Sequence, residues 1–400
     1  MNTLIKKELP AKRKFWLNDM EAIVIIMILL VIIGTINIFS ASFVTAEMTF
    51  KNPYFFLTRH LISIVIGLAA FFIATNFDYH RLRAAVPFLM AFTLVALVVV
   101  LITGVSVNGA KRWIGIGSMQ FQPSEIAKIV GIVMSASFLG AKIDADKIIT
   151  PFNRTLLIVL IMAALVEVEP DMGTAVLVAG IPILMYVVAG MNVRWIGYCG
   201  IAVALVAAFM ITIQPYRMER LKSWYDPWSQ SQGVGYQTVQ SLSAIGSGGL
   251  WGMGLGKGVS KYSYLPEAHT DFAFAVFSQE NGLIAVLVVF VLYMTLAIYC
   301  ANIARRAHDG FGKMMACGIM LLTVGQAAAN MAMIIGLLPV VGVPLPFISY
   351  GGTSLILNMA SIGVLINIGR YAAYKAAKEK NTIAGGMITI KTNQRLRRLK

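Results

Sequence analysis

The sequence predicts an all-α membrane protein with ten transmembrane helices and a long extracytoplasmic loop between helices 7 and 8. Two observations predict this class. Hydrophobic residues make up 58% of the 400 residues and charged residues only 13%, a composition that soluble domains do not have. Apolar runs of about 20 residues, the length that crosses a bilayer as a helix, also recur along nearly the whole chain.

We expect the ten spans at residues 20–42, 57–76, 85–103, 124–141, 154–168, 172–190, 196–213, 273–299, 314–336 and 351–370. They form one membrane domain, residues 20–370, between an N-terminal tail (1–19) and a basic C-terminal tail (371–400). The long loop covers residues 214–272 and is rich in glycine. It is too small to be predicted as a separate enzyme domain, so any chemistry there needs the helix ends as its scaffold.

The distribution of Lys and Arg predicts which side of the membrane each loop faces. A net charge of +15 would suggest nucleic-acid binding in a soluble protein, but here it is better interpreted as topology, so we expect no nucleic-acid partner. If the N-terminus is cytoplasmic, the short inside loops carry 9 Lys and Arg and the short outside loops carry 4. Because the positive-inside rule weighs short loops most, we expect both tails in the cytoplasm.

The first outer segment, residues 108–128, combines cations with a Trp and a spaced ion pair. Lys111 and Arg112 precede Trp113, which is typical either of cations that extend to the interface beside an aromatic belt residue or of a clamp for an anionic headgroup. Glu125 and Lys128 are three residues apart and share a helix face. They form either a helix-stabilising pair near the interface or part of a polar cavity.

The second outer segment crowds three carboxylates into a tight turn. Glu167, Glu169 and Asp171 lie within five residues, with Pro170 between them and Gly173 just after. Proline fixes φ there, and glycine allows two helices to approach closely. The cluster could bind a cation, orient a base or hold Lys111 and Arg112, and a purely structural turn is the alternative.

The long loop begins with a basic, aromatic and amphipathic stretch, residues 214–228, that is typical of an element lying at the outer interface. A glycine-rich run follows at residues 232–258, which is either a flexible loop or a source of backbone amides for phosphate. The loop ends in YLPEAHTDF, residues 264–272, which contains His269 and Asp271. Because a mid-bilayer charge costs roughly 2.5–3.5 kcal/mol, an aspartate at the start of a spanning helix indicates a function.

The fourth outer segment, Gly336 to Ser354, contains Pro339, Pro344 and Pro346, and also Ser349. The prolines predict either a rigid turn or a broken, re-entrant element, which is tolerated at membrane depth only where it lines a cavity or is buried in protein. Together the outer segments offer cations for a pyrophosphate and a carboxylate for proton abstraction from a sugar hydroxyl. The residues therefore predict an anionic, lipid-linked substrate at the outer leaflet, and leave open whether the sugar is transferred or the lipid is moved.

Five motifs, GAKRWI, QPSEIAK, EPDMGT, YLPEAHTDFAF and PLPFISYGGTS, resemble those of the bacterial SEDS proteins (shape, elongation, division and sporulation). They occur in the family's order and span nearly all ten helices. Ala268, between the Glu and the His of the fourth motif, is more similar to the division type, FtsW, than to the elongation type, RodA. The chain departs from the family pattern at residues 278–282, SQENG, so no role is carried over to Glu280.

The resemblance implies a peptidoglycan glycosyltransferase of the bacterial cytoplasmic membrane that acts at the division septum. It would polymerise lipid II through β-1,4 linkages and release undecaprenyl pyrophosphate, with Asp271 as general base on the acceptor 4-hydroxyl. Lys111 and Arg112 would bind the pyrophosphate, and Asp171 would organise the site. The implied partners are a class B penicillin-binding protein, which cross-links the strands as a transpeptidase, and other divisome membrane proteins.

Further candidate substrate contacts lie in the same motifs: Trp113, Glu125, Lys128, His269, Pro346 and Ser349. No cofactor is assigned, and a divalent cation is left open. The alternatives are a polymerase of the elongation or sporulation type, a lipid II flippase, and a non-catalytic scaffold for the transpeptidase. A flippase needs a polar path to the cytoplasmic side, whereas the unexplained polar residues gather on one face, which favours chemistry.

Overall fold

The computed structural model describes residues 18–107, 110–116, 119–213, 215–262 and 265–397. Most of the predicted N-terminal tail therefore lies outside the described residues, as do Asn108, Gln214 and Tyr264 at the starts of three outer segments. The predicted candidate site residues all lie within the described ranges.

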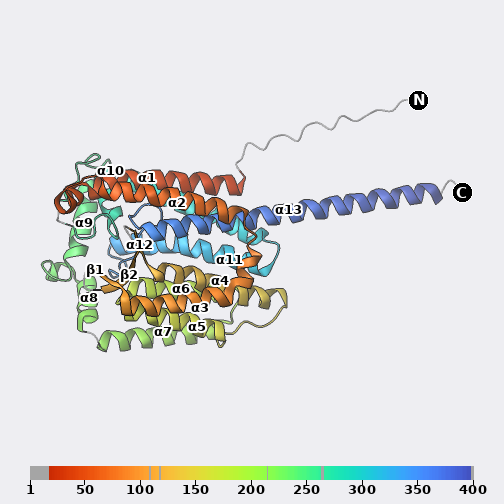
Figure 1. The fold of residues 1–400 in the computed structure, drawn as a ribbon, viewed down its shortest axis with the longest axis horizontal. Coiled ribbons are helices and arrows are strands. Elements are labelled where there is room, and N and C mark those ends of the chain that lie inside the picture. The colour runs from red at the N-terminus through yellow and green to blue at the C-terminus, as the bar shows by residue number, and fades with distance from the viewer. Residues whose placement is uncertain (1–17, 108–109, 117–118, 214, 263–264, 398–400) are drawn as a thin grey trace, which may run out of the picture.

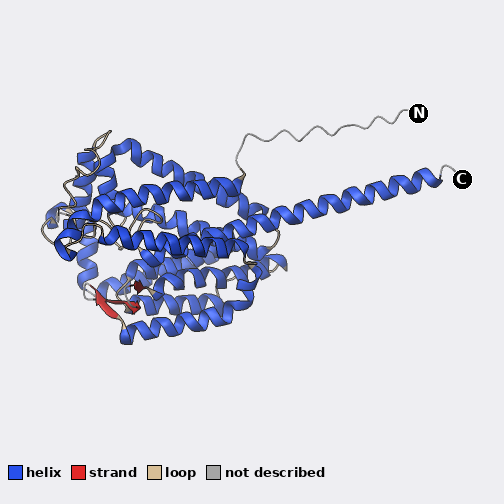
Figure 2. Cartoon of the chain, turned by 45° about the horizontal axis from the view of Figure 1, so that its top comes forward, coloured by secondary structure: helices blue, strands red, loops and turns tan. Residues whose placement is uncertain are grey.

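Helices form most of the described chain, and three short strands lie at one end of it (Figures 1 and 2). The helices are α1 (Asp19–Phe50), α2 (Phe55–Asn76), α3 (His80–Thr103), α4 (Pro123–Asp144), α5 (Arg154–Val168), α6 (Met172–Val188), α7 (Val193–Ile213), α8 (Pro215–Tyr225), α9 (Tyr236–Gly248), α10 (Ala273–Arg306), α11 (Gly310–Met320), α12 (Gln326–Ile334) and α13 (Gly352–Arg397). The strands β1 (Val105–Val107), β2 (Ala110–Ile116) and β3 (Met119–Phe121) pair antiparallel in chain order.

The long helices lie side by side in a bundle with two distinct ends (Figure 1). At one end α1 begins and α13 leaves the bundle, and α13 continues beyond the other helices. At the opposite end lie α8, α9 and the strands. The predicted C-terminal tail is thus a continuation of the last helix through Arg397 rather than a separate segment.

Within the residues that the structure describes, seven helical segments are long and apolar enough to cross a membrane, which makes the chain a multi-pass membrane protein. They are Asp19–Phe50, Phe55–Asn76, His80–Thr103, Pro123–Asp144, Ala273–Arg306, Gly310–Ile334 and Gly352–Glu379. The other three predicted spans coincide with α5, α6 and α7, which have 15, 17 and 21 residues. The segment Gly310–Ile334 contains a π-helical stretch, Leu321–Gly325, between α11 and α12.

Polar side chains begin several of the helices at positions where the backbone amides have no helical partner. Asn153 accepts a hydrogen bond from the Leu156 amide at the start of α5, and Asp309 accepts one from the Gly312 amide at the start of α11. Asp171 does the same for the Thr174 amide at the start of α6. The carboxylate cluster of the second outer segment therefore includes a helix cap.

The glycine-rich run is not a plain flexible loop, because it contains α9 and then a segment, residues 249–254, that inserts into a break in α10. The break is at Gly282, where φ is 73° and ψ is −177°. The amides of Met253 and Gly254 donate to the carbonyls of Gln279 and Glu280, and the Leu283 amide donates to the Gly249 carbonyl. The inserted segment thus satisfies backbone groups that the broken helix cannot pair internally.

A buried ion pair fastens the next part of the loop, residues 258–261, to the same region of α10. Lys261 Nζ lies 2.8 Å from Glu280 Oε1, and the two side chains are 4% and 1% exposed. Ser40 of α1 donates to Glu280 Oε2 over 2.7 Å, and the Gly258 amide donates to Oε1 over 3.3 Å. Glu280, to which the sequence assigned no role, therefore joins α1, α10 and the long loop.

We expect Lys261→Met to lower the thermal unfolding midpoint of the purified protein markedly. The substitution leaves the Glu280 carboxylate buried without its cation, and breaking one member of a buried pair costs about 3–5 kcal/mol. The double variant Lys261→Met/Glu280→Met should recover most of this loss, because an apolar pair of similar volume is often neutral. Lys257→Met, an exposed cation of the same loop, is the matched control. Equal melting of Lys261→Met and Lys257→Met would contradict the anchoring role.

Candidate functional site

Asp271 lies where two irregular segments meet at the α8–α9 end of the bundle. It is half-buried in the turn that precedes α10, two residues before that helix begins. The proline-rich segment passes directly opposite, because a Cβ atom at Gly342 would lie 3.2 Å from Asp271 Oδ2. Gly342 has a φ of 69°, a conformation that favours glycine, so the residue provides both the turn and the space for the carboxylate.

Asn330 of α12 fixes these two segments to each other. Its Nδ2 atom donates to the Asp271 carbonyl over 2.8 Å and to the Val343 carbonyl over 2.6 Å. One turn earlier on the same helix, Gln326 Nε2 donates to the Pro344 carbonyl over 2.8 Å. The proline-rich segment, which has no helical hydrogen bonds of its own here, is therefore held by amide side chains from within the bundle.

Glu125 and Lys128 support this arrangement from α4. Lys128 Nζ lies 2.8 Å from Glu125 Oε1 and 3.1 Å from Gln326 Oε1, and the Lys128 side chain is only 2% exposed. The predicted pairing on one helix face is confirmed, but the pair lies inside the bundle rather than at the interface. Because Lys128 bonds to the Gln326 side chain, this geometry gives the ion pair the role of positioning Gln326.

Arg112 of β2 faces the carboxylate turn. Its Nη1 atom lies 4.0 Å from Asp171 Oδ1, its Nε atom donates to the Glu169 carbonyl over 3.2 Å, and its Nη2 atom donates to the Pro170 carbonyl. Gln122 Nε2 donates to Asp171 Oδ2 over 2.9 Å. Arg112 thus comes together with Asp171, as the sequence suggested, while Lys111 on the same strand is exposed and Trp113 is half-buried.

The α6 end of this turn contacts the proline-rich segment directly. A Cβ atom at Gly173 would collide with the Val341 carbonyl, so only glycine lets α6 approach this closely. From the other side, Arg220 of α8 donates to the Val340 carbonyl over 2.8 Å, and Arg217 pairs with Glu167. Arg220 is a site cation that the five motifs missed, although it lies in the basic, aromatic stretch 214–228.

The other predicted residues shape the backbone around Asp271. The Tyr350 amide donates to the His269 carbonyl over 2.9 Å, and the His269 ring lies 4.4 Å from the Phe56 ring of α2. Ser349 Oγ accepts from the Leu345 amide over 2.9 Å, and Tyr293 of α10 donates to the Pro346 carbonyl. These contacts make His269, Pro346 and Ser349 parts of the scaffold that fixes the two irregular segments.

Burial, together with the nearby Glu267 and Asp171 carboxylates, raises the pKa of Asp271 to about 7, against the lowering effect of Arg112 and Arg220. Such a carboxyl exchanges a proton readily near neutral pH, which suits a general base. Burial lowers the pKa of His269, against the opposing effect of Glu267. His269 is therefore held in its neutral form and adds no positive charge beside Asp271.

Glu169 is the most isolated carboxyl group of the site. Its side chain is fully buried, and neither of its carboxylate oxygens has a hydrogen-bond partner within the part of the chain that the structure describes. Burial, and secondarily the charge of Asp171, raises the pKa of Glu169 to about 8. Glu169 is thus protonated at neutral pH, and Asp171 is the member of the turn that pairs with Arg112.

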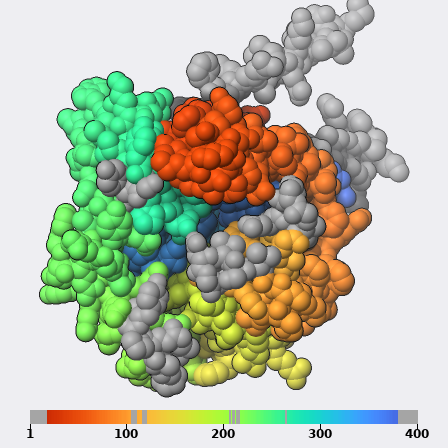
Figure 3. Space-filling model, turned by 60° about the vertical axis from the view of Figure 1, so that its left-hand side comes forward, coloured from red at the N-terminus to blue at the C-terminus, as the bar shows by residue number. Residues whose placement is uncertain are grey.

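Figure 3 shows this end of the molecule, where the green α8–α9 region lies on one side, the orange and yellow first half lies on the other, and blue surface of the C-terminal part is visible between them. The site is therefore assembled from segments that are far apart in the sequence. The site offers the half-buried base Asp271, the guanidinium groups of Arg112 and Arg220, whose charges act on it, and a rigid backbone of proline and glycine.

A sequence model of the FtsW, RodA and SpoVE family, described as cell cycle protein, matches residues 20–374. The chain belongs to the SEDS family. Stage V sporulation protein E of Bacillus subtilis is 39% identical over 358 residues, covering 88% of this chain and 97% of that protein. A probable peptidoglycan glycosyltransferase FtsW of Geobacter sp. is 38% identical over 352 residues, covering 87% and 96%.

Solved structures agree with this assignment to the SEDS family. A chain from a study entitled structural coordination of polymerization and crosslinking by a peptidoglycan synthase complex has a TM-score of 0.72 and 26% identity, covering 87% of this chain and 96% of that one. The crystal structure of the rod shape determining protein RodA of Thermus thermophilus has a TM-score of 0.63 and 25% identity, covering 87% and 95%. The helical arrangement is therefore that of the family.

We expect the thermal stability of the wild type to fall relative to that of Glu169→Gln as pH rises from about 4.5 to about 8. The folded state binds the Glu169 proton more tightly than the unfolded state, whose carboxyl has its ordinary pKa of 4.5, so unfolding becomes easier across this interval. Melting curves at a series of pH values test this. Glu167→Gln should not remove this loss of thermal stability at high pH, because Glu167 pairs with Arg217. Parallel pH curves for the wild type and Glu169→Gln would refute a buried neutral carboxyl.

Proposed function

We propose that the chain is a peptidoglycan glycosyltransferase that polymerises lipid II into glycan strands at the outer face of the cytoplasmic membrane and releases undecaprenyl pyrophosphate. The observation that carries this proposal is the half-buried Asp271 with a pKa raised to about 7, fixed between two rigid segments and flanked by Arg112 and Arg220. The names of its FtsW relatives support the same activity.

In the proposed reaction, Asp271 accepts the proton of the acceptor 4-hydroxyl while the hydroxyl oxygen forms a bond to the anomeric carbon of the donor sugar. The bond between that carbon and the pyrophosphate oxygen breaks, and the pyrophosphate leaves with the electron pair. Arg112, with the exposed Lys111 on the same strand, would stabilise the charge of the leaving group. Asp171 holds Arg112 in place, and Asn330 holds the backbone of Asp271.

We further propose that all ten predicted segments span the membrane and that both tails lie in the cytoplasm. The common end at which α1 begins and α13 leaves, opposite the end with Asp271, supports this topology. Within this orientation the tails 1–19 and 371–400 are cytoplasmic, and the long loop 214–272 is extracytoplasmic. Among the described residues, no group of three or more His, Cys, Asp or Glu side chains could hold a metal ion.

We also propose that the chain works at the division septum with a class B penicillin-binding protein and other divisome membrane proteins. The match to a chain from a study of a peptidoglycan synthase complex, whose title pairs polymerization with crosslinking, supports a transpeptidase partner. The sequence feature that supports the division role is Ala268 between Glu267 and His269.

Asp271→Asn should reduce glycan formation from lipid II by roughly 10²–10⁴-fold, the usual contribution of a general base. The measurement is the amount of glycan made by the purified protein with its transpeptidase partner. Asp226→Asn, which removes an exposed carboxylate of the outer loop, is the matched control and should retain activity. Equal product from Asp271→Asn and wild type would rule out the base. Transport of lipid II across vesicles by a wild type that makes no glycan would instead indicate a flippase.

The polymerisation rate should rise with pH below about 7 and level off above it, because only the deprotonated form of Asp271 accepts a proton. Glu267→Gln should move the midpoint to lower pH, since the Glu267 charge is the largest electrostatic cause that raises this pKa. Single-turnover rates across a pH series measure both midpoints. Glu219→Gln removes an exposed carboxylate of α8 and should leave the midpoint in place. A midpoint unchanged by Glu267→Gln would show that another group titrates.

A further inference from the structure

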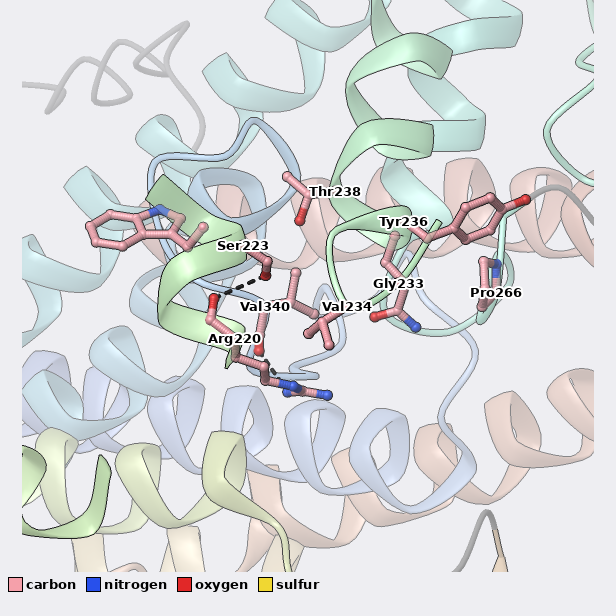
Figure 4. Close-up of a pocket in the computed structure, with 10 residues that line it drawn as sticks. Arg220, Ser223, Gly233, Val234, Tyr236, Thr238, Pro266 and Val340 are labelled. Atoms are coloured by element: carbon pink, nitrogen blue, oxygen red, sulfur yellow. Dashed lines mark hydrogen bonds between the residues drawn. The ribbon is translucent and has the colours of Figure 1, made fainter. Parts of the chain in front are cut away.

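A cavity of about 460 Å³ lies between α8, α9 and the two segments that hold Asp271 (Figure 4). Arg220 and Ser223 of α8 lie on one side of it, and Tyr236 of α9 and Pro266 lie on the other. Thr238 and Val340 lie between these sides. The volume falls in the range of roughly 300–1,000 Å³ that ligand pockets occupy, which accommodates a disaccharide.

The cavity borders the reaction centre. Pro266 begins the PEAHTD segment that ends at Asp271, and Val340 lies in the proline-rich segment two residues before Gly342, which faces the carboxylate. Arg220 links the two regions, because its Nη1 atom donates to the Val340 carbonyl over 2.8 Å and its charge acts on Asp271. In Figure 4 the Arg220 guanidinium points toward the helices of the bundle, at the edge of the cavity. A molecule in the cavity would therefore contact both segments that hold the base.

The lining suits an uncharged ligand with many hydroxyl and amide groups. It combines the hydroxyls of Ser223 and Thr238, the amide of Gln237 and the aromatic side chains of Trp224 and Tyr236. Hydroxyls and amides both donate and accept hydrogen bonds, and aromatic rings with a polar edge pack against the apolar faces of sugars. Among the described residues of the lining, Arg220 is the only charged one, whereas phosphate groups are usually met by several cations.

We propose that this cavity binds an N-acetylated amino-sugar disaccharide of the glycan strand, against the two segments that hold Asp271. The proposal rests on the proposed function, since a glycan binds here because a glycan is made here. It assigns the sugars to the side of α8 and α9 and leaves the pyrophosphate to the side of Arg112. Gln237, Thr238 and Tyr236 are then substrate-binding residues that none of the five sequence motifs contains.

The test uses the full chain in lipid nanodiscs with Asp271→Asn, which prevents turnover. The probe is a lipid-free tetrasaccharide of alternating N-acetylglucosamine and N-acetylmuramic acid, and its affinity is measured by calorimetry. Gln237→Leu should weaken binding about tenfold, which is the effect of losing one hydrogen bond between the Gln237 amide and the ligand. Gln240→Leu changes another half-buried glutamine of α9 that does not line the cavity, and should bind as the parent does. Ser223→Ala, a smaller change, covers the case in which Gln237→Leu does not fold.

In the otherwise wild-type protein, Gln237→Leu should raise KM for lipid II with little change in kcat. Equal affinity of Gln237→Leu and Gln240→Leu, no binding of the tetrasaccharide, or its displacement by inorganic pyrophosphate would each overturn the proposal. Binding that depends on Gln237 in a protein that makes no glycan would uphold the cavity and reject the proposed function. If the protein polymerises lipid II but binds the tetrasaccharide independently of Gln237, the proposed function would be upheld and the cavity proposal rejected.

Discussion

The two hydrogen bonds of Asn330 are the contacts on which the rest of the site depends. They join the carbonyl of Asp271 to that of Val343, and so connect two segments that have no helical hydrogen bonds at this point. Irregular backbone at the end of a membrane bundle is stable only where the protein supplies the missing partners. Gln326 and the Lys128–Glu125 pair extend the same support inward, so the position of the carboxylate is set by a buried chain of polar side chains that begins on α4.

The charged groups around Asp271 are held by different parts of the protein. Arg112 donates two hydrogen bonds to carbonyls of one tight turn and lies 4.0 Å from the Asp171 carboxylate, and Arg220 donates to the proline-rich segment. Each guanidinium is thereby oriented before a substrate arrives, which lowers the reorganisation needed when negative charge develops. Glu169 remains neutral close by because its pKa is raised to about 8, so the turn carries less negative charge than its three carboxyl groups suggest.

Hydropathy predicted where most helices lie, because a bilayer-spanning helix needs about 20 apolar residues in a row. Spacing alone predicted that Glu125 pairs with Lys128, and the basic, aromatic composition of residues 214–228 pointed to the stretch that contains Arg220. The sequence did not predict Asn330 or Gln326, since single amides in an apolar helix differ little from ordinary polar residues until their distant partners are known. The break in α10 lies at the end of the polar stretch SQENG, which the sequence showed as a departure from the family pattern but not as a break, and α9 was hidden by its glycines. These features depend on contacts between α10 and a loop more than twenty residues away in the chain.

The break at Gly282 has a consequence for engineering proteins of this kind. Replacing a glycine inside a helix with alanine is a standard way to gain stability, because alanine restricts the unfolded chain and favours the helix. At Gly282 the same substitution would lower stability, since φ is 73° and a methyl group would collide with the inserted backbone of Gly252 and Leu250. A variant straightened there would gain a regular helix and expel residues 249–254, which are inserted at the break. Thermostabilised versions for structural or screening work should therefore keep this glycine and be sought elsewhere in the bundle.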